Sequence, residues 1–195
     1  MKTIYFVRHG ESESNFGLIM SGSGDNIPLT AKGREQAKQA GQDLKDKRIE
    51  LMVCSPLIRT VDTAKIIAEQ IGYDPEKIVQ NPILVERTYG IYDGRPAEHY
   101  KKDYAAGTVH SSVETEKQLY DRIKNALAWL SELPEDRIAV VAHGGVRRAV
   151  YVINENLHHS HMYKIDSFGN GEIYEFQLWT FYTLVTSWVV LESRL

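Results

Sequence analysis

Apolar runs that alternate with amphipathic stretches constrain the fold of this chain more than any other feature. Three β-branched and aromatic runs predict buried strands: TIYFV (3–7), ELMVC (50–54) and RIAVVAH (137–143). Four stretches with apolar residues at helical spacing predict helices: 30–46, 55–71, 114–132 and 146–155. The alternation predicts an α/β fold with three layers, α/β/α, around a mostly parallel central sheet.

The ends of these elements carry recognisable signals. Thr30 is a suitable N-cap, Ser55 is expected to cap the next helix with Pro56 in its first turn, and Gly72 is expected to end that helix. Residues 82–86 predict a short strand or extended piece. Two β-rich stretches, about 172–179 and 182–190, complete the sheet. We expect one domain over residues 1–195, with an inserted loop at about 87–112 that holds one short helix.

Composition excludes several classes of partner. The formal net charge of the 195 residues is −3, so nothing global attracts nucleic acid or an acidic membrane surface. No apolar run approaches the roughly 20 residues of a membrane span, and no secretory signal is visible. Cys54 is the single cysteine, which fits a reducing compartment. We therefore expect a cytoplasmic protein, with neither nucleic acid nor membrane as partner.

Polar side chains follow the predicted strands where each strand ends. Arg8 and His9 end the first strand, Arg59 lies in the first turn after the second, and His143 ends the third. The carboxyl ends of parallel strands meet at one edge of a sheet, where ligands bind. Two arginines, two histidines and helix N-termini at this edge predict an anion pocket suited to phosphate. Glu86 adds a carboxyl group that can protonate a leaving-group oxygen.

Five motifs in order resemble the histidine phosphatase superfamily, also called the phosphoglycerate mutase-like family. They are RHGES with Asn15, PLTAKGREQA, SPLIRTVDTA, VERTYG and VAHGGVRRAV. The resemblance runs from residue 3 to about residue 150 and implies a phosphoglycerate mutase-like fold. It also implies that His9 is a nucleophile that forms a phosphohistidine, and that Glu86 is the proton donor. Further residues would contact phosphate or substrate: Arg8, Ser12, Asn15, Arg59, His143 and the backbone of Gly144.

Three functions remain open at this stage. The ERTYG motif resembles the ERHYG of mutases, but the segment after YGIYDG lacks their paired arginines and the loop at 16–29 lacks their usual tryptophan. We therefore favour a phosphatase acting on a small phosphorylated metabolite, without a metal or another cofactor. A phosphoglycerate mutase is the alternative, and a non-catalytic phospholigand-binding module is a third possibility. The oligomeric state is not predicted.

Two further groups of polar residues have plain interpretations. The HHSH cluster, His158 to His161, has no evident ligand partner at helical spacing, so we expect a solvated surface cluster rather than a metal site. Arg147 and Arg148 follow the glycine turn. One of them could point toward the site, but we expect them to be surface charges of a helix.

Overall fold

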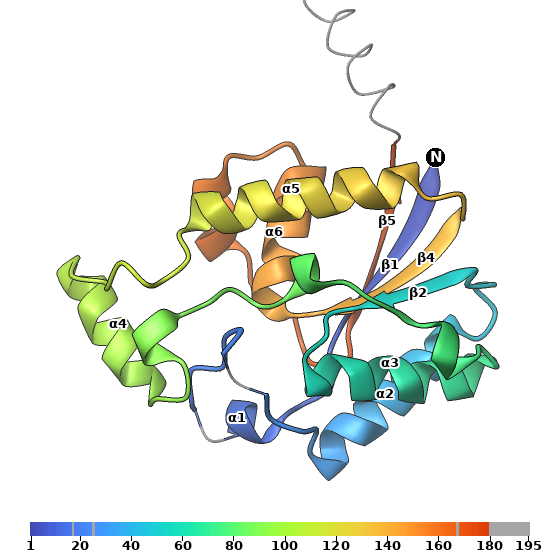
Figure 1. Ribbon diagram of the computed structural model, residues 1–195, viewed down its shortest axis with the longest axis horizontal. Coiled ribbons are helices and arrows are strands. Elements are labelled where there is room, and N and C mark those ends of the chain that lie inside the picture. Colours follow the sequence, from blue (N-terminus) through green and yellow to red (C-terminus); the bar gives the residue numbers. More distant parts are fainter. Residues whose placement is uncertain (17, 25, 167, 180–195) are drawn as a thin grey trace, which may run out of the picture.

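A five-stranded sheet lies at the centre of the computed structural model, which describes residues 1–195 except 17, 25, 167 and 180–195. Its strands are β1 (Lys2–Arg8), β2 (Leu51–Cys54), β3 (Val79–Gln80), β4 (Arg137–Ala142) and β5 (Ile173–Leu178). In the sheet they lie in the order β3-β2-β4-β1-β5 (Figure 1). Every pair is parallel except β1 with β5. The prediction of a mostly parallel sheet is confirmed.

Helices cover both faces of the sheet. On one face lie α2 (Ala31–Leu44) and α3 (Ile58–Ile71), and on the other α5 (Glu116–Glu132) and α6 (Gly144–Asn154) (Figure 1). Successive side chains of a strand point to opposite faces, so β1 contributes side chains to two cores. Ile4 and Phe6 join the core that includes residues of α5 and α6, whereas Tyr5 and Val7 join the core that includes residues of α2 and α3. These are the three layers that the sequence predicts.

Shorter elements lie around this frame. They are α1 (Glu13–Phe16), α4 (Ala97–Ala106) and four 3-10 turns: η1 (Pro75–Lys77), η2 (Pro82–Leu84), η3 (Gly90–Tyr92) and η4 (His159–Lys164). Helix α4 is the short helix expected inside 87–112, and it projects away from the sheet (Figure 1). A small cluster of Tyr92, Tyr100 and Val113 holds it in place. None of the helices in the described part of the chain is long and apolar enough to cross a membrane.

Three local predictions need correction or fall outside the described residues. Helix α3 begins at Ile58 with Leu57 at its N-cap, so Ser55 does not cap it. Residues Pro82–Leu84 form a 3-10 turn rather than a strand, and β3 is the edge strand instead. Of the two C-terminal stretches, 172–179 contains β5, and 182–190 lies outside the described residues.

The loop after β1 packs unusually closely on the first turn of α2. Thr30 caps that helix by accepting a hydrogen bond from the Gly33 amide at 3.0 Å, as predicted. A Cβ atom on Gly33 would overlap the Glu11 carbonyl, and one on Gly10 would overlap the carbonyl of Gly33. Only glycine lets the two backbones approach to this distance. This contact fixes the chain immediately after His9.

Gly33→Ala should therefore lower the free energy of unfolding, although alanine is the better helix former. Backbone atoms on both sides must shift, and such overpacking costs about 2 kcal/mol. Urea denaturation followed by circular dichroism measures the change. The control is Gly107→Ala, where φ is +69° and nothing lies within 4 Å, so only the left-handed penalty of about 1 kcal/mol applies. A Gly33→Ala protein as stable as the wild type would contradict this account.

Candidate active site

Two histidines meet at the carboxyl edge of the sheet because β1 and β4 are in register. Arg8 pairs with Ala142, so the next residues, His9 and His143, leave the two strands side by side. The His9 amide donates to the Ala142 carbonyl at 3.0 Å. The two ring centroids are 5.3 Å apart, with an interplanar angle of 64°. Both side chains are buried.

His9 is held in one tautomer and kept neutral. Its Nδ1 lies 2.7 Å from the Gly10 carbonyl oxygen. Because a carbonyl only accepts hydrogen bonds, Nδ1 carries the proton and Nε2 carries the lone pair. Burial, followed by the charge of Arg59, lowers the pKa of His9 from 6.5 to about 3. At neutral pH the imidazole is therefore an uncharged nitrogen base among cations.

His143 has a hydroxyl partner from a third strand end. Its Nε2 lies 2.8 Å from the hydroxyl of Ser55, which directly follows β2. Burial and then the charge of Arg59 hold the pKa of His143 well below its usual value. The residue expected to cap a helix thus contacts a site histidine instead. The carboxyl ends of β1, β4 and β2 all contribute to one cluster.

Backbone carbonyls hold the two arginines. Arg8 donates from Nη1 to the Phe168 carbonyl, and burial lowers the pKa of its guanidinium. Arg59 is 1% exposed and donates from Nη2 to the Gly22 carbonyl at 3.1 Å. A carbonyl dipole orients a guanidinium without cancelling its charge. Positive charge is thus concentrated where His9 and His143 lie.

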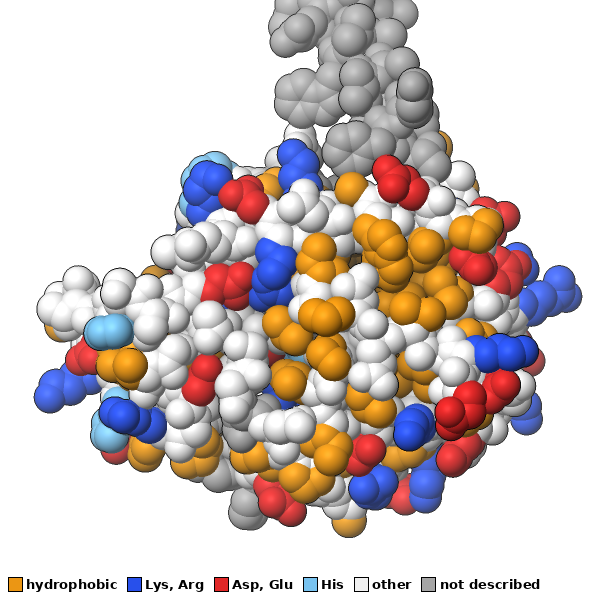
Figure 2. Space-filling view, in the orientation of Figure 1, with side chains coloured by type: hydrophobic (Ala, Val, Ile, Leu, Met, Phe, Trp, Pro, Cys, Tyr) orange, Lys and Arg blue, Asp and Glu red, His pale blue; other side chains and the backbone are white. Residues whose placement is uncertain are grey.

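The surface charges on one face of the molecule are of both signs (Figure 2). On the face shown in Figure 2, the described acidic and basic side chains are intermixed along the edges, and apolar side chains gather between them. The attraction for an anion comes from the buried arginines. This matches the formal net charge of −3 and the prediction of a local anion site.

Glu86 reaches the same edge and is fixed by two amides. Gly145 donates to Oε2 at 3.0 Å, and Arg87 donates to Oε1 at 2.8 Å. A Cβ atom on Gly145 would overlap Oε1, so the carboxylate packs directly on the first turn of α6. The neighbouring Gly144 faces Arg8, whose Nε would lie 3.4 Å from an added Cβ. The carboxyl group and one arginine thus meet at the same helix N-terminus.

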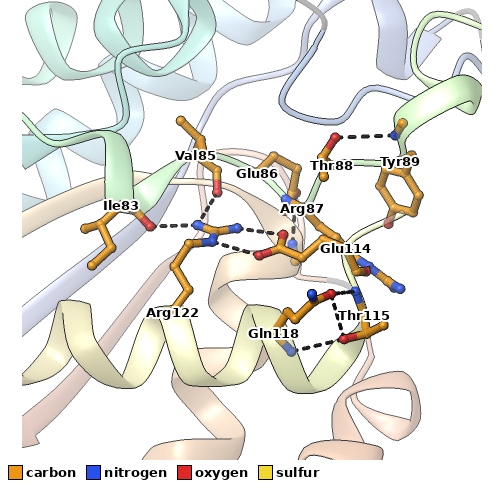
Figure 3. A network of polar contacts seen from close by, with 12 residues as sticks. Ile83, Val85, Glu86, Arg87, Thr88, Tyr89, Glu114, Thr115, Gln118 and Arg122 are labelled. Carbon is orange, nitrogen blue, oxygen red and sulfur yellow. Dashed lines mark hydrogen bonds and ion pairs between the residues drawn. The ribbon is translucent and has the colours of Figure 1, made fainter. Parts of the chain in front are cut away.

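A salt-bridge network on α5 positions the segment that carries Glu86 (Figure 3). Arg122 donates from Nε and Nη2 to the two carboxylate oxygens of Glu114, each at 2.9 Å. Its Nη1 donates to the carbonyls of Ile83 at 2.6 Å and Val85 at 2.9 Å. The short segment before Glu86 is therefore attached to a helix of the core.

The remaining predicted contacts have different outcomes. Ser12 is buried, with its hydroxyl 3.0 Å from that of Ser14. Asn15 belongs to α1, and its side chain lies outside what the structure describes. Gly144 is the first residue of α6. The structure brings His9, His143, Arg8, Arg59 and Glu86 together at one edge of the sheet. Their roles, like those of Ser12, Asn15 and Gly144, stay predictions.

Sequence reasoning missed the loop before β5. Asn170 donates from Nδ2 to the His9 carbonyl at 3.0 Å, and the Gly171 amide donates to the Arg8 carbonyl at 3.0 Å. This loop also provides the Phe168 carbonyl that holds Arg8. No local pattern in the sequence predicts these contacts, since they join residues about 160 positions apart.

Arg147, which follows the glycine turn, also differs from expectation. Arg147 is 3% exposed, and its guanidinium lies over the rings of Tyr174 at 4.2 Å and Tyr151 at 5.6 Å. Burial lowers its pKa to about 10. It is a buried cation–π residue and not a surface charge.

The HHSH cluster forms part of η4, where the rings of His158 and His159 are 4.0 Å apart. Within the described ranges, no group of three or more His, Cys, Asp or Glu side chains is arranged to hold a metal ion.

The cluster combines three chemical capacities. A neutral, oriented imidazole presents a nitrogen lone pair at neutral pH. Two guanidinium groups attract and orient the oxygens of a tetrahedral anion. A fixed carboxyl group can give or take a proton beside them. Together these capacities suit phosphoryl transfer through a covalent intermediate.

Comparisons with known proteins agree with this chemistry. The model of the histidine phosphatase superfamily (branch 1) matches residues 4–190. The chain is 35% identical over 151 residues to a protein of Bacillus subtilis named as the uncharacterized phosphatase PhoE, covering 77% of this chain and 76% of that one. It is 36% identical over 155 residues to the probable phosphoglycerate mutase GpmB of Citrobacter koseri, covering 74% and 70%. The solved structure of Bacillus stearothermophilus YhfR superposes with a TM-score of 0.82 at 22% identity, over 91% of each chain.

The buried neutral His9 should make stability depend on pH. Its pKa is about 3 in the folded protein against 6.5 in the unfolded chain, so between these values the unfolded chain binds more protons. The contribution to stability is complete above pH 6.5 and is lost as the pH falls toward 3, by about 1.4 kcal/mol per pH unit. Replacing His9 by asparagine removes this titration.

Urea unfolding at pH 7.5 and pH 5, in buffers without phosphate, checks the effect. The stability lost between the two values should be smaller in His9→Asn than in the wild type by about 2 kcal/mol. His99→Asn, at an exposed position of α4, is the control and should follow the wild type. Equal losses in wild type and His9→Asn would mean that His9 is not buried in its neutral form.

Proposed function

Because this chain belongs to the histidine phosphatase superfamily, we propose that it is a metal-independent phosphatase acting in the cytoplasm on a small phosphorylated metabolite. The superfamily is the one that the five sequence motifs indicate. The observation that carries the proposal is the neutral, oriented His9 between Arg8 and Arg59, with the Glu86 carboxyl group at the same edge. A site that only binds phosphate needs the cations but neither the nucleophile nor the acid.

In the first step, His9 Nε2 attacks the phosphorus atom. A P–N bond forms while the bond from phosphorus to the leaving-group oxygen breaks, and Glu86 gives its proton to that oxygen. The phosphorylated imidazole gains positive charge, which the Nδ1–H bond to the Gly10 carbonyl stabilises. Arg8, Arg59 and His143 hold the oxygens of the phosphoryl group as it moves.

In the second step, water replaces the alcohol. Glu86, now a carboxylate, takes a proton from the water molecule as its oxygen attacks phosphorus. The P–N bond breaks, inorganic phosphate leaves, and His9 returns to its neutral state. The low pKa of His9 favours this return because the free imidazole is not protonated at neutral pH.

Guanidinium groups take the part that a metal ion plays in other phosphoryl-transfer sites. Arg59 is almost fully buried and Arg8 is partly buried, and electrostatic stabilisation is strongest where water is excluded. Both donate hydrogen bonds to backbone carbonyls, which orient the two guanidinium groups. We therefore assign no catalytic cofactor to this reaction.

A phosphoglycerate mutase is the second candidate, because several relatives are named probable phosphoglycerate mutase and the ERTYG motif begins at the proton donor Glu86. A mutase must keep water from the phosphohistidine while its substrate changes orientation in the site. The segment at 95–102 has Arg95, Lys101 and Lys102 exposed to solvent. Because this segment is exposed, we expect water to reach the phosphohistidine, and we favour water as the acceptor of the phosphoryl group.

Leaving-group dependence should reveal the role of Glu86. Glu86→Gln should lower kcat/KM at least about 100-fold for glycerol 3-phosphate, whose alkoxide needs a proton. The loss should be much smaller for 2,4-dinitrophenyl phosphate, whose leaving group departs unprotonated. Steady-state phosphate release with both esters measures the contrast. Glu98→Gln, exposed on α4, is the control. An equal loss for both esters would reject Glu86 as the acid.

Loss of the nucleophile should abolish turnover on every ester. His9→Ala should lower kcat at least about 1,000-fold for alkyl and aryl phosphates alike. Rapid quenching of the wild type with radiolabelled substrate should trap acid-labile, alkali-stable phosphate on the protein, and His9→Ala should trap none. Hydrolysis by His9→Ala at the wild-type rate would overturn the mechanism.

Product analysis separates the two candidate functions. Incubation with 3-phosphoglycerate should release inorganic phosphate and form no 2-phosphoglycerate, with or without added 2,3-bisphosphoglycerate. Phosphorus NMR follows both products in one sample. Formation of 2-phosphoglycerate stimulated by the bisphosphate would identify a mutase instead.

A further inference from the structure

Asp93 is a partly buried carboxylate that the proposed mechanism does not use. It directly follows η3, in the segment inserted between Glu86 and α5. Its Oδ2 accepts hydrogen bonds from the Thr88 hydroxyl and the Tyr89 amide, each at 3.3 Å. Within the described ranges, no lysine or arginine forms an ion pair with it. Uncharged groups of the chain therefore hold this carboxylate in place.

The same carboxylate packs on the loop between α1 and α2. Its Oδ1 is buried, and a Cβ atom on Gly22 would overlap this oxygen and lie 2.6 Å from the Arg87 carbonyl. A Cβ atom on Gly24 would lie 3.1 Å from Oδ2. Burial raises the pKa of Asp93, and the amides of Tyr89, Gly22 and Gly24 oppose that rise. The carboxylate of Asp93 thus joins two segments that are far apart in the sequence.

Gly22 provides the carbonyl that orients Arg59. The Arg59 side chain is 1% exposed, and its Nη2 donates to this carbonyl at 3.1 Å. The loop is also attached to the start of α3, because the Asn26 side chain accepts from the Ile58 amide at 2.7 Å. A guanidinium binds two phosphate oxygens at once only when its plane is correctly oriented. The position of the Gly22 carbonyl therefore affects how Arg59 meets the phosphoryl group.

Backbone hydrogen bonds attach the loop to the inserted segment on the other side of Gly22. The Met20 amide donates to the Arg95 carbonyl at 2.8 Å, and the Gly94 amide donates to the Met20 carbonyl at 2.9 Å. Among the described residues, this pairing ends at Met20, two residues before Gly22. At Gly22 the Asp93 carboxylate packs against the loop instead. A side chain thus continues an attachment that the backbone begins.

We propose that Asp93 is a positioning residue for phosphate binding, whose carboxylate holds the Gly22 carbonyl where it orients Arg59. This inference rests on the proposed function, which assigns Arg59 to the phosphoryl group. Asp93 belongs to the segment that begins at Glu86, so the same contact links the segment of the proton donor to the arginine. Asparagine fits the same space, but it replaces one acceptor oxygen by an amide that cannot accept from a backbone N–H group. Asp93→Asn should therefore disturb Arg59 without opening a cavity.

Inorganic phosphate is the probe, because its binding is measured without turnover. Asp93→Asn should raise the Kd for phosphate about tenfold, which is the effect of weakening one hydrogen-bonded contact of a charged group. Titration followed by amide chemical shifts in NMR spectra measures Kd even where binding is weak. Asp103→Asn is the control and should keep the wild-type Kd. It is the same substitution in the same inserted segment, where the carboxylate accepts from the Tyr92 hydroxyl at 2.6 Å.

A double-mutant cycle with Arg59→Lys separates positioning from a general structural role. Lysine keeps the charge but lacks the planar fork that needs orientation. In the Arg59→Lys protein, Asp93→Asn should therefore change Kd by less than about twofold. Gly22→Ala disturbs the same contact from the other side and should raise Kd as Asp93→Asn does, and the two changes together should raise it no further. Circular dichroism and thermal melting establish that each variant is folded.

Two results would overturn the proposal. One is an Asp93→Asn protein that binds phosphate as tightly as the wild type. The other is an equal loss of affinity in the wild-type and Arg59→Lys backgrounds, which would make Asp93 a structural residue only. If Asp93→Asn does not fold, the cycle of Gly22→Ala with Arg59→Lys decides in the same way. A wild type that shows this coupling in phosphate binding but hydrolyses no phosphomonoester would refute the phosphatase function alone.

Discussion

The in-register pairing of β1 with β4 is the constraint on which the rest of the site depends. Both strands end at the same level, so Arg8 pairs with Ala142 and the two histidines leave the sheet together. A shift by one residue would turn one histidine to the opposite face of the sheet. The pairing is stabilised by two cores in which alternate side chains of β1 pack, including Phe6 on one face and Val7 on the other. The packing of these two cores thus fixes the distance between the imidazole rings of His9 and His143.

A second constraint is electrostatic. Placing Arg8 and Arg59 beside His9 in a buried space is unfavourable for the folded protein without a ligand. The unfavourable terms are reduced in two ways: the imidazoles stay neutral, and carbonyl dipoles orient the guanidinium groups. Both devices leave the two guanidinium groups beside the histidines. The pocket is therefore organised for a dianion before one arrives, which is the preorganisation that phosphoryl transfer requires.

Local patterns were enough to predict most of the frame and the polar centre of the site. The runs TIYFV and IAVVA are almost wholly apolar, which is typical of strands buried on both faces; His143 follows the second run directly, and His9 follows the first run after Arg8. Parallel strands then bring those ends together without any knowledge of their register. Glu86 was harder to assign, because its segment is not a strand and is positioned by contacts with other elements.

Contacts between distant segments account for what the sequence did not reveal. Ser55 had a sound local interpretation as a helix cap, yet its hydroxyl is used by His143. The sequence assigns no role to Arg122 or Glu114, and only the fold shows them holding the segment before Glu86. Asn170 lies in a loop without periodicity or motif. Each of these roles depends on tertiary neighbours rather than on spacing.

The placement of Arg8 and Arg59, each hydrogen-bonded to a backbone carbonyl, has a consequence for the protein inside a cell. Binding of a small tetrahedral oxyanion would reduce the electrostatic cost of placing two guanidinium groups near a neutral histidine, and the proposed phosphatase reaction would release one such anion, inorganic phosphate. Because a ligand that binds only the folded state stabilises it in proportion to the logarithm of its concentration, ambient phosphate would act both as product inhibitor and as folding ligand. Under the proposed function, turnover and lifetime of the molecule would then respond in opposite directions to one metabolite, because rising phosphate would slow the reaction and stabilise the folded protein.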